Sequence, residues 1–93
     1  MYTLSWSHGF RRGFKKATRN NPVLQGKIFS VLEKLSIEPF DPALKTHKLY
    51  GKLAGLWACR VEYDCRIVFA FLKEPDKKDL IALVDIGKYD EVY

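Results

Sequence analysis

The sequence predicts a single α+β domain spanning residues 1–93, with a first strand, a hairpin of two helices and a three-stranded antiparallel meander. Two observations carry this prediction. Apolar residues recur at helical spacing in the first half of the chain. From residue 56 onward they alternate with polar residues or form short apolar runs, as strands do. The two helices are expected to pack on one face of the sheet.

The first half supplies the first strand and both helices. Residues 2–6 alternate apolar and polar side chains, and Ser7 is a suitable cap for a helix that ends near Asn20. An Asn-Pro pair at 21–22 then starts a second helix, which Pro39 closes. The buried stripe of the first helix consists of Phe10, Phe14 and Ala17. The apolar face of the second consists of Leu24, Ile28, Val31, Leu32 and Leu35.

The second half supplies the meander. Residues 56–62 alternate, 63–65 form a turn, and 66–72 are a nearly continuous apolar strand. Residues 74–78 are expected to be a solvated hairpin loop before the last strand, 80–86. Trp57, Phe69 and Phe71 lie inside these strand patterns and are expected in the core.

The length of the turn decides which faces two arginines occupy. If the turn loops three residues, Arg60, Glu62 and Arg66 point to the same face of the sheet. If it loops two, Arg60 and Arg66 point to opposite faces, because one residue of register inverts a strand. The sequence leaves this open.

The charge is unevenly distributed. The net charge is +5, but residues 1–60 hold eleven Lys and Arg against three acids, and residues 61–93 hold five against eight. A basic front half favours a polyanionic partner, most commonly a nucleic acid. An ordinary solvated surface is the alternative.

Several kinds of site are not expected. Cys59 and Cys65 form no C-x-x-C motif and are interpreted as reduced thiols. His8 and His47 have no ligand-spaced cysteines or acids beside them, so neither a metal nor a cofactor is predicted. No apolar run approaches the roughly 18 residues of a membrane span, and the N-terminus lacks the apolar stretch of a signal peptide. We therefore expect a cytoplasmic protein.

Residues 47–69, HKLYGKLAGLWACRVEYDCRIVF, resemble the RelE/ParE superfamily of toxins, and within it the YafQ and YoeB branches. The shared parts are an H-x-L-x-G loop, a G-x-W strand opening and a short turn into R-[IL]-V-[FY]. The terminal IGKYDEVY is similar to the G-x-H-D-E-V-Y ending of many such toxins. The resemblance implies the RelE/microbial RNase-like fold and a metal-free, ribosome-dependent endoribonuclease that cleaves messenger RNA. It also implies a cognate antitoxin that wraps the toxin and covers a basic cleft.

Metal-free cleavage by the ribose 2′-OH needs a base, cations around the phosphorane and an acid for the 5′-oxygen. His47 matches the YafQ histidine and is the candidate base, since an imidazole titrates near pH ~6.5; a structural hydrogen bond is the alternative. Arg66 matches the family arginine and suits bidentate phosphate binding. Its alternative is an ion pair with Glu62 or Asp64. Arg60 stands where YafQ-like proteins carry a histidine and RelE a lysine.

The tail supplies the remaining candidates. Tyr93 matches the RelE tyrosine and is expected to stack on a base or donate a proton. Tyr89 stands where YafQ and YoeB relatives carry a histidine; a phenol, with a pKa near ~10, is a feasible acid but a poor base. Activity is therefore expected to be weaker or differently arranged. The basic side chains expected to contact RNA are Lys45, Lys48, Lys52, Lys88, Arg11, Arg12, Lys15 and Lys16.

Two other functions fit the same resemblance. One is a ParE-like inhibitor of DNA gyrase, against which the retention of His47 with Arg60 and Arg66 argues, because a pure binding protein needs no base near paired cations. The other is a catalytically degenerate module that only binds the antitoxin, which Tyr89 leaves open.

Overall fold

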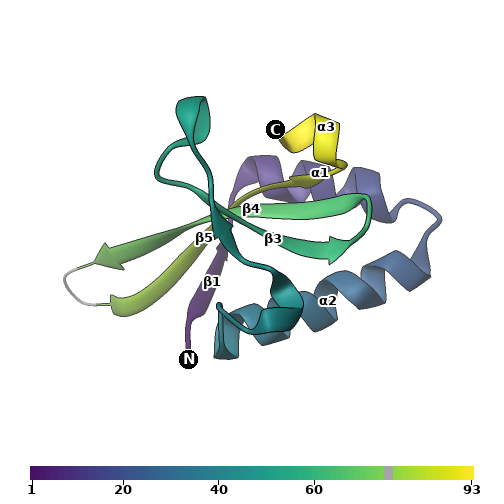
Figure 1. The fold of residues 1–93 in the computed structure, drawn as a ribbon. Coiled ribbons are helices and arrows are strands. Elements are labelled where there is room, and N and C mark those ends of the chain that lie inside the picture. The colour runs from purple at the N-terminus through teal and green to yellow at the C-terminus, as the bar shows by residue number, and fades with distance from the viewer. Residues whose placement is uncertain (75–76) are drawn as a thin grey trace.

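A computed structural model describes residues 1–74 and 77–93 of the chain (Figure 1). Its helices are α1 (His8–Thr18), α2 (Pro22–Ile37) and α3 (Tyr89–Val92), with short 3-10 turns η1 (Pro42–Leu44) and η2 (Gly51–Leu53). Its strands are β1 (Thr3–Trp6), β2 (His47–Lys48), β3 (Trp57–Glu62), β4 (Cys65–Glu74) and β5 (Lys77–Gly87).

The strands that are described form one sheet in the order β1-β5-β4-β3-β2. The pairs β3–β4 and β4–β5 are antiparallel, which confirms the predicted meander, and β1 runs parallel to β5. Two elements were not predicted, the two-residue strand β2 and the terminal helix α3. The predicted bounds of the loop, 74–78, were too wide, because Glu74 still belongs to β4 and Lys77 already belongs to β5. Pro75 and Asp76 lie outside the described residues.

The helix boundaries follow the predicted caps. The side chain of Ser7 accepts a hydrogen bond from the backbone N–H of Phe10 at 3.0 Å, and that of Asn21 accepts from Leu24 at 3.1 Å. Each bond satisfies one of the N–H groups that a helix leaves unpaired at its start. Between the helices Asn20 takes a left-handed conformation (φ 55°), which reverses the chain.

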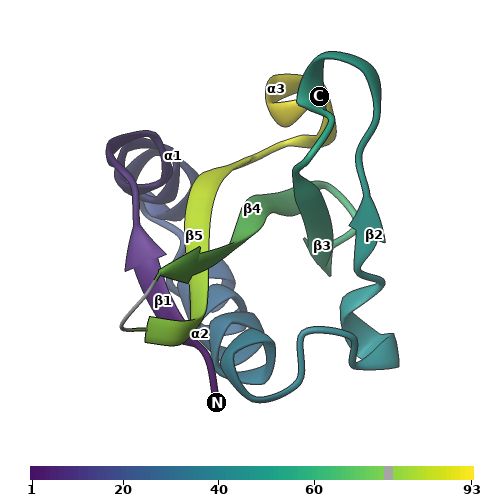
Figure 2. The same cartoon turned by 90° about the vertical axis from the view of Figure 1, so that its left-hand side faces the viewer.

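The core lies between the two long helices and one face of the sheet, with α1 and α2 on the same side as Figure 2 shows. All five predicted apolar positions of α2 are buried. They pack with Phe10 of α1 and with buried side chains of the central strands, among them Ile67 and Phe69. Trp57 and Phe71 are half-buried and pack against this core, in agreement with the prediction. Within the described residues, no helix is both long and apolar enough to span a membrane.

Both cysteines are free thiols buried in the core. Burial raises the pKa of Cys59 to about 12 and that of Cys65 to about 11. Since the thiolate is the reactive form, neither cysteine is suited to act as a nucleophile.

Candidate active site

The hairpin between β3 and β4 determines where the two arginines point. The turn loops two residues, since Glu62 pairs with Cys65 across Tyr63 and Asp64. A β-bulge between Arg60 and Glu62 then shifts the register by one residue, so Arg60 pairs directly with Arg66. Cross-strand partners share a face of the sheet. The expectation that a two-residue turn separates the arginines was therefore wrong, because it did not allow for the bulge.

His47 lies on the same face as the arginines. His47 pairs with Ala58 on β3, which is two residues before Arg60. The positions of His47 and Arg60 are therefore offset by about 7 Å along the strand direction. This face, called the site face below, is opposite to the one that buries Cys59 and Ile67 against the helices. The register thus brings together three residues that the sequence proposed separately.

The imidazole of His47 has a defined partner. Its Nδ1 lies 3.0 Å from the carbonyl oxygen of Lys45, a residue with a left-handed backbone (φ 51°). A carbonyl only accepts, so in the neutral ring Nδ1 carries the proton and Nε2 is the unprotonated nitrogen. The structural hydrogen bond named as the alternative role of His47 is therefore present, through Nδ1. It leaves Nε2 free to act as a base.

Arg66 is held by the backbone of the turn. Its Nη1 donates to the carbonyl oxygens of Glu62, Tyr63 and Cys65 at 2.5–3.3 Å. Among the described residues no carboxylate forms an ion pair with Arg66, and the carboxylate of Glu62 instead contacts Lys27 at 3.1 Å. The alternative of an Arg66 pair with Glu62 or Asp64 was thus wrong. The guanidinium is fixed in place while its charge is not neutralised.

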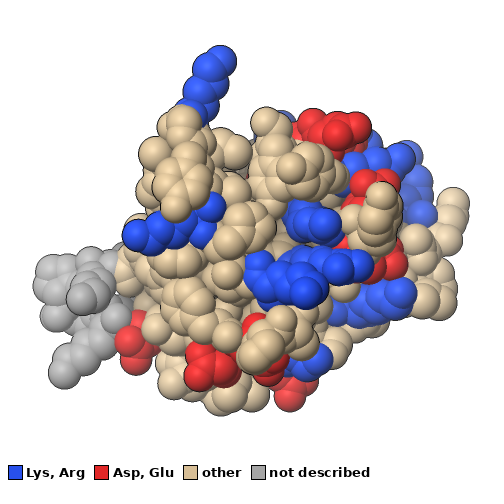
Figure 3. Space-filling view, viewed as in Figure 1, with Lys and Arg blue, Asp and Glu red and all other residues tan. Residues whose placement is uncertain are grey.

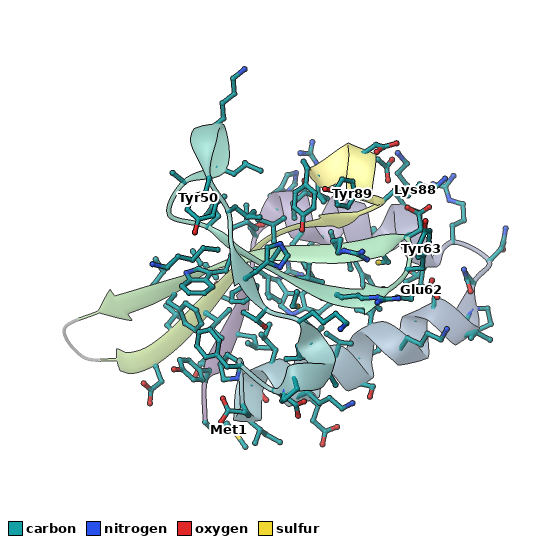
Figure 4. The ribbon with its side chains drawn as sticks, viewed as in Figure 1. Met1, Tyr50, Glu62, Tyr63, Lys88 and Tyr89 are labelled. Atoms are coloured by element: carbon teal, nitrogen blue, oxygen red, sulfur yellow. The ribbon has the colours of Figure 1, made fainter. Side chains whose placement is uncertain are left out.

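The terminal helix α3 places two tyrosines beside Arg66. The guanidinium carbon lies 5.9 Å from the ring centre of Tyr89, and the rings of Tyr89 and Tyr93 meet edge to face at 4.6 Å. Burial raises the pKa of Tyr93, an effect that the positive charge of Arg66 partly opposes. Figure 4 shows Tyr89 on α3, above the β3–β4 hairpin that carries Glu62 and Tyr63. Arg66, Tyr89 and Tyr93 are called the arginine–tyrosine cluster below.

The predicted RNA-contacting residues fall into two groups. Lys45, Lys48, Lys52 and Lys88 are all exposed. Lys48 pairs with Trp57 and therefore lies on the face opposite to His47, where its ammonium lies over the ring of Trp57 at 5.5 Å. Figure 3 shows basic side chains gathered over the β3–β4 hairpin, and one more at the tip of the loop that contains η2. The group on α1 is separate, because α1 covers the other face of the sheet. It consists of Arg11, Arg12, Lys15 and Lys16.

A groove of about 630 Å³ lies between α1, the start of α2, the β3–β4 turn and α3. Its lining includes Leu24, Glu62 and Lys88, and acidic residues outnumber basic ones in it. None of the five predicted catalytic residues lines it. The groove therefore adjoins the arginine–tyrosine cluster without being the site. In the part of the chain that is described, no cluster of three His, Cys, Asp or Glu side chains is arranged to hold a metal ion.

Sequence reasoning missed two residues near the site. Tyr50 is 80% exposed on the loop around η2, which bends at Gly51 (φ 68°) and Gly55 (φ 92°). Figures 1 and 2 both place this loop and α3 on the same side of the sheet. Two glycines four residues apart, with an aromatic residue beside the first, were the signal for a projecting loop. The second residue, Glu91, contacts Lys16 at 2.6 Å; no local pattern pointed to it, because 75 positions separate the pair.

A mixed five-stranded sheet with two helices packed on one face is also the fold of solved toxins of the RelE/YoeB/YafQ type. A metal-bound toxin from Helicobacter pylori has a TM-score of 0.80 with 26% identity over 100% of both chains. YafQ from Escherichia coli strain BL21(DE3) has a TM-score of 0.78 with 20% identity over 100% of this chain and 99% of its own. A YoeB/ParE toxin from Agrobacterium tumefaciens has a TM-score of 0.77 with 19% identity, covering 96% of this chain and 99% of its own.

YafQ is also similar in its complex with DinJ, where it has a TM-score of 0.78 and 19% identity over 100% of this chain and 99% of its own. No protein-family model matches the sequence, and no curated protein matches it significantly. The likeness is therefore one of structure, carried by the whole length of the chain.

Proposed function

We propose that this protein is the toxin of a type II toxin–antitoxin pair and that it cleaves messenger RNA on the ribosome without a metal ion. The observation that carries the proposal is the strand register, which puts His47, Arg60 and Arg66 on one face with two tyrosines beside Arg66. The structural likeness to YafQ and YoeB toxins supports the toxin class. The solved DinJ–YafQ complex supports a cognate antitoxin as partner.

In the proposed reaction, Nε2 of His47 removes the proton of the ribose 2′-OH. The 2′-oxygen then bonds to the neighbouring phosphorus, and the bond from phosphorus to the 5′-oxygen breaks, which leaves a 2′,3′-cyclic phosphate. Arg60 and Arg66 stabilise the additional negative charge of the phosphorane. A phenol returns a proton to the departing 5′-oxygen.

Tyr89 is the proposed proton donor and Tyr93 its support. The ring of Tyr89 lies against the guanidinium of Arg66, so a phosphate bound by Arg66 would lie near this phenol. Tyr93 packs edge to face on Tyr89, and burial raises its pKa, which makes it a weaker acid than an ordinary phenol. If Tyr89 serves only for stacking, the donor is Tyr93.

The RNA strand is proposed to cross the site face. Lys45, Lys52 and Lys88 would contact its phosphates, whereas Lys48 points to the opposite face beside Trp57. The ring of Tyr50 offers a stacking surface for a splayed base. The separate basic group on α1 would contact ribosomal RNA, since it lies on the far side of the sheet from the cleaved strand. Such a protein acts in the cytoplasm.

Induced expression without the antitoxin tests the proposal. Pulse labelling should show that protein synthesis fails before DNA synthesis, with messenger RNA cut. Purified protein that has been treated with EDTA and then freed of it should cut messenger RNA on programmed ribosomes, and His47→Ala should not. Failure of replication first, with messenger RNA intact, would favour the gyrase inhibitor. If the protein folds and the cells nevertheless continue to grow, the result would favour a module that only binds the antitoxin.

A further inference from the structure

Helix α3 depends on the rest of the fold for its position. Its four residues are far fewer than a helix needs to persist in water. Val92 anchors it by burying its side chain against Gly87. A Cβ on Gly87 would lie 3.1 Å from Oε1 of Glu91 and 3.5 Å from Cγ1 of Val92, so α3 packs closely on this residue and a side chain there would displace the Glu91 carboxylate slightly.

The carboxylate of Glu91 ties α3 to two other parts of the chain. Its Oε2 lies 2.6 Å from Nζ of Lys16 on α1. Its Oε1 accepts a hydrogen bond from the backbone N–H of Lys88 at 2.9 Å, which caps the start of α3. The hydrogen bond from Lys16 lowers the pKa of Glu91, and the bond from the Lys88 backbone lowers it further. The carboxylate therefore links the N-terminal helix to the residue at which the chain leaves β5.

The tyrosines of the arginine–tyrosine cluster lie at the two ends of α3, since Tyr89 begins the helix and Tyr93 caps it. Tyr89 and Tyr93 flank Glu91 in sequence. Their rings contact each other, and the ring of Tyr89 lies against Arg66 on the sheet. Any rotation of α3 about its Val92 anchor would change the distance from both rings to the guanidinium. Glu91 contacts none of the reacting groups, so its effect on them is through the orientation of α3.

We propose that the Lys16–Glu91 pair is a latch that positions Tyr89 and Tyr93 against Arg66. Glu91 and Lys16 are positioning residues, and the inference rests on the proposed function for its catalytic consequence. The pair is exposed, with 75% of the Lys16 side chain and 39% of the Glu91 side chain accessible to solvent. An exposed pair of this kind changes an equilibrium only about two- to fivefold. The latch therefore shifts the proportion of correctly placed helix and does not determine folding.

Three substitutions on α1 separate the latch from a general loss of basic charge. Lys16→Ala breaks the latch, Lys16→Arg retains a cation that can contact Glu91, and Lys15→Ala removes the same charge from a neighbour with no ion pair among the described residues. Any loss of RNA binding is shared by the two alanine variants and appears in KM. An effect of the latch appears in kcat and only in Lys16→Ala.

The direct readout is the titration of Tyr93, followed by NMR of protein labelled with ¹³C at the tyrosine ring. In Lys16→Ala the ring becomes more exposed, so the raised pKa of Tyr93 should fall toward its ordinary value. It should stay raised in Lys15→Ala and return in Lys16→Arg. In single-turnover cleavage at saturating ribosomes, the rate constant of Lys16→Ala should fall measurably and by no more than about fivefold, with rescue by arginine.

Two results would overturn the latch: a Tyr93 titration in Lys16→Ala identical to that of the unmodified protein, or a shifted titration with unchanged kcat. The NMR titration needs no RNA. If the unmodified protein cuts no RNA, the proposed function fails, and the titration still decides whether Lys16 and Glu91 hold α3.

Discussion

Alanine at Gly13 should destabilise the protein, whereas alanine at Gly26 should stabilise it. Both glycines lie inside helices, Gly13 in α1 and Gly26 in α2. A Cβ on Gly13 would lie 2.3 Å from the carbonyl oxygen of Ile86, while contacts under 3.0 Å are essentially never seen. The opposing atom belongs to the backbone of β5, so α1 must move away from the sheet. A Cβ on Gly26 meets no atom within 4 Å.

Both substitutions favour the helix, but only Gly13→Ala introduces a steric clash. Replacing glycine by alanine within a helix stabilises it by about 0.5–1 kcal/mol. Forcing an extra carbon into a packed contact costs about 1–3 kcal/mol, so Gly13→Ala should lose about 1–2 kcal/mol net. For a domain of this size that corresponds to a fall in Tm of roughly 4–16 °C, against a small rise for Gly26→Ala.

Thermal and urea unfolding followed by circular dichroism measure both effects. Lys16 follows Gly13 by three residues, on the same side of α1, so Gly13→Ala should also weaken the contact between Lys16 and Glu91. If Gly13→Ala proves as stable as Gly26→Ala, α1 does not approach β5 as closely as the structure places it, and the reasoning fails.

Four further predictions concern the site and the thiols. Arg66→Ala should lower single-turnover cleavage by about 10²–10³-fold, and Arg66→Lys should recover only part, because an ammonium lacks the planar fork; full activity in folded Arg66→Ala would exclude this role. Tyr89→His should keep or raise the rate near neutral pH and Tyr89→Phe should lower it; a wild-type rate for Tyr89→Phe would make Tyr89 a stacking residue. The raised pKa of Tyr93 means that the neutral phenol contributes its full stabilisation below the ordinary tyrosine pKa and loses it as pH rises through the raised value. Urea unfolding of Tyr93→Phe should therefore show a smaller loss of stability above about pH 10 than the unmodified protein, and equal losses would contradict this. With pKa values of about 12 and about 11, Cys59 and Cys65 should resist alkylation at pH 8 until the protein is unfolded in urea, and rapid labelling of the native protein would refute their burial.

The elements that depend on local chemistry were predictable from the sequence. The caps at Ser7 and Asn21 act within three residues along the chain, so the residues that form them lie next to each other in the sequence. The apolar face of α2 recurs at helical spacing, and every predicted position is buried. Patterns of this kind need no knowledge of the partner against which a helix or strand packs.

The geometry of the site depends on features that local patterns do not contain. The bulge between Arg60 and Glu62 adds one residue to one strand, and nothing in the alternation of β3 marks it. β2 has only two residues and exists because His47 and Lys48 pair with β3. Glu91 gains its partner from the opposite end of the chain. The sequence was thus sufficient to propose which residues belong to the site. It was not sufficient to predict which of them lie next to each other.

The directly paired arginines give a physical reason to place an anion on the site face. Like charges at opposed positions of two strands repel, and Arg60 and Arg66 occupy such positions. Among the described residues no carboxylate forms an ion pair with either of them. The carbonyl oxygens that hold Arg66 are dipoles, which orient the guanidinium without cancelling its charge. The fold therefore retains a repulsion that a bound phosphate would relieve, and relief is greatest where negative charge increases, as it does in the phosphorane.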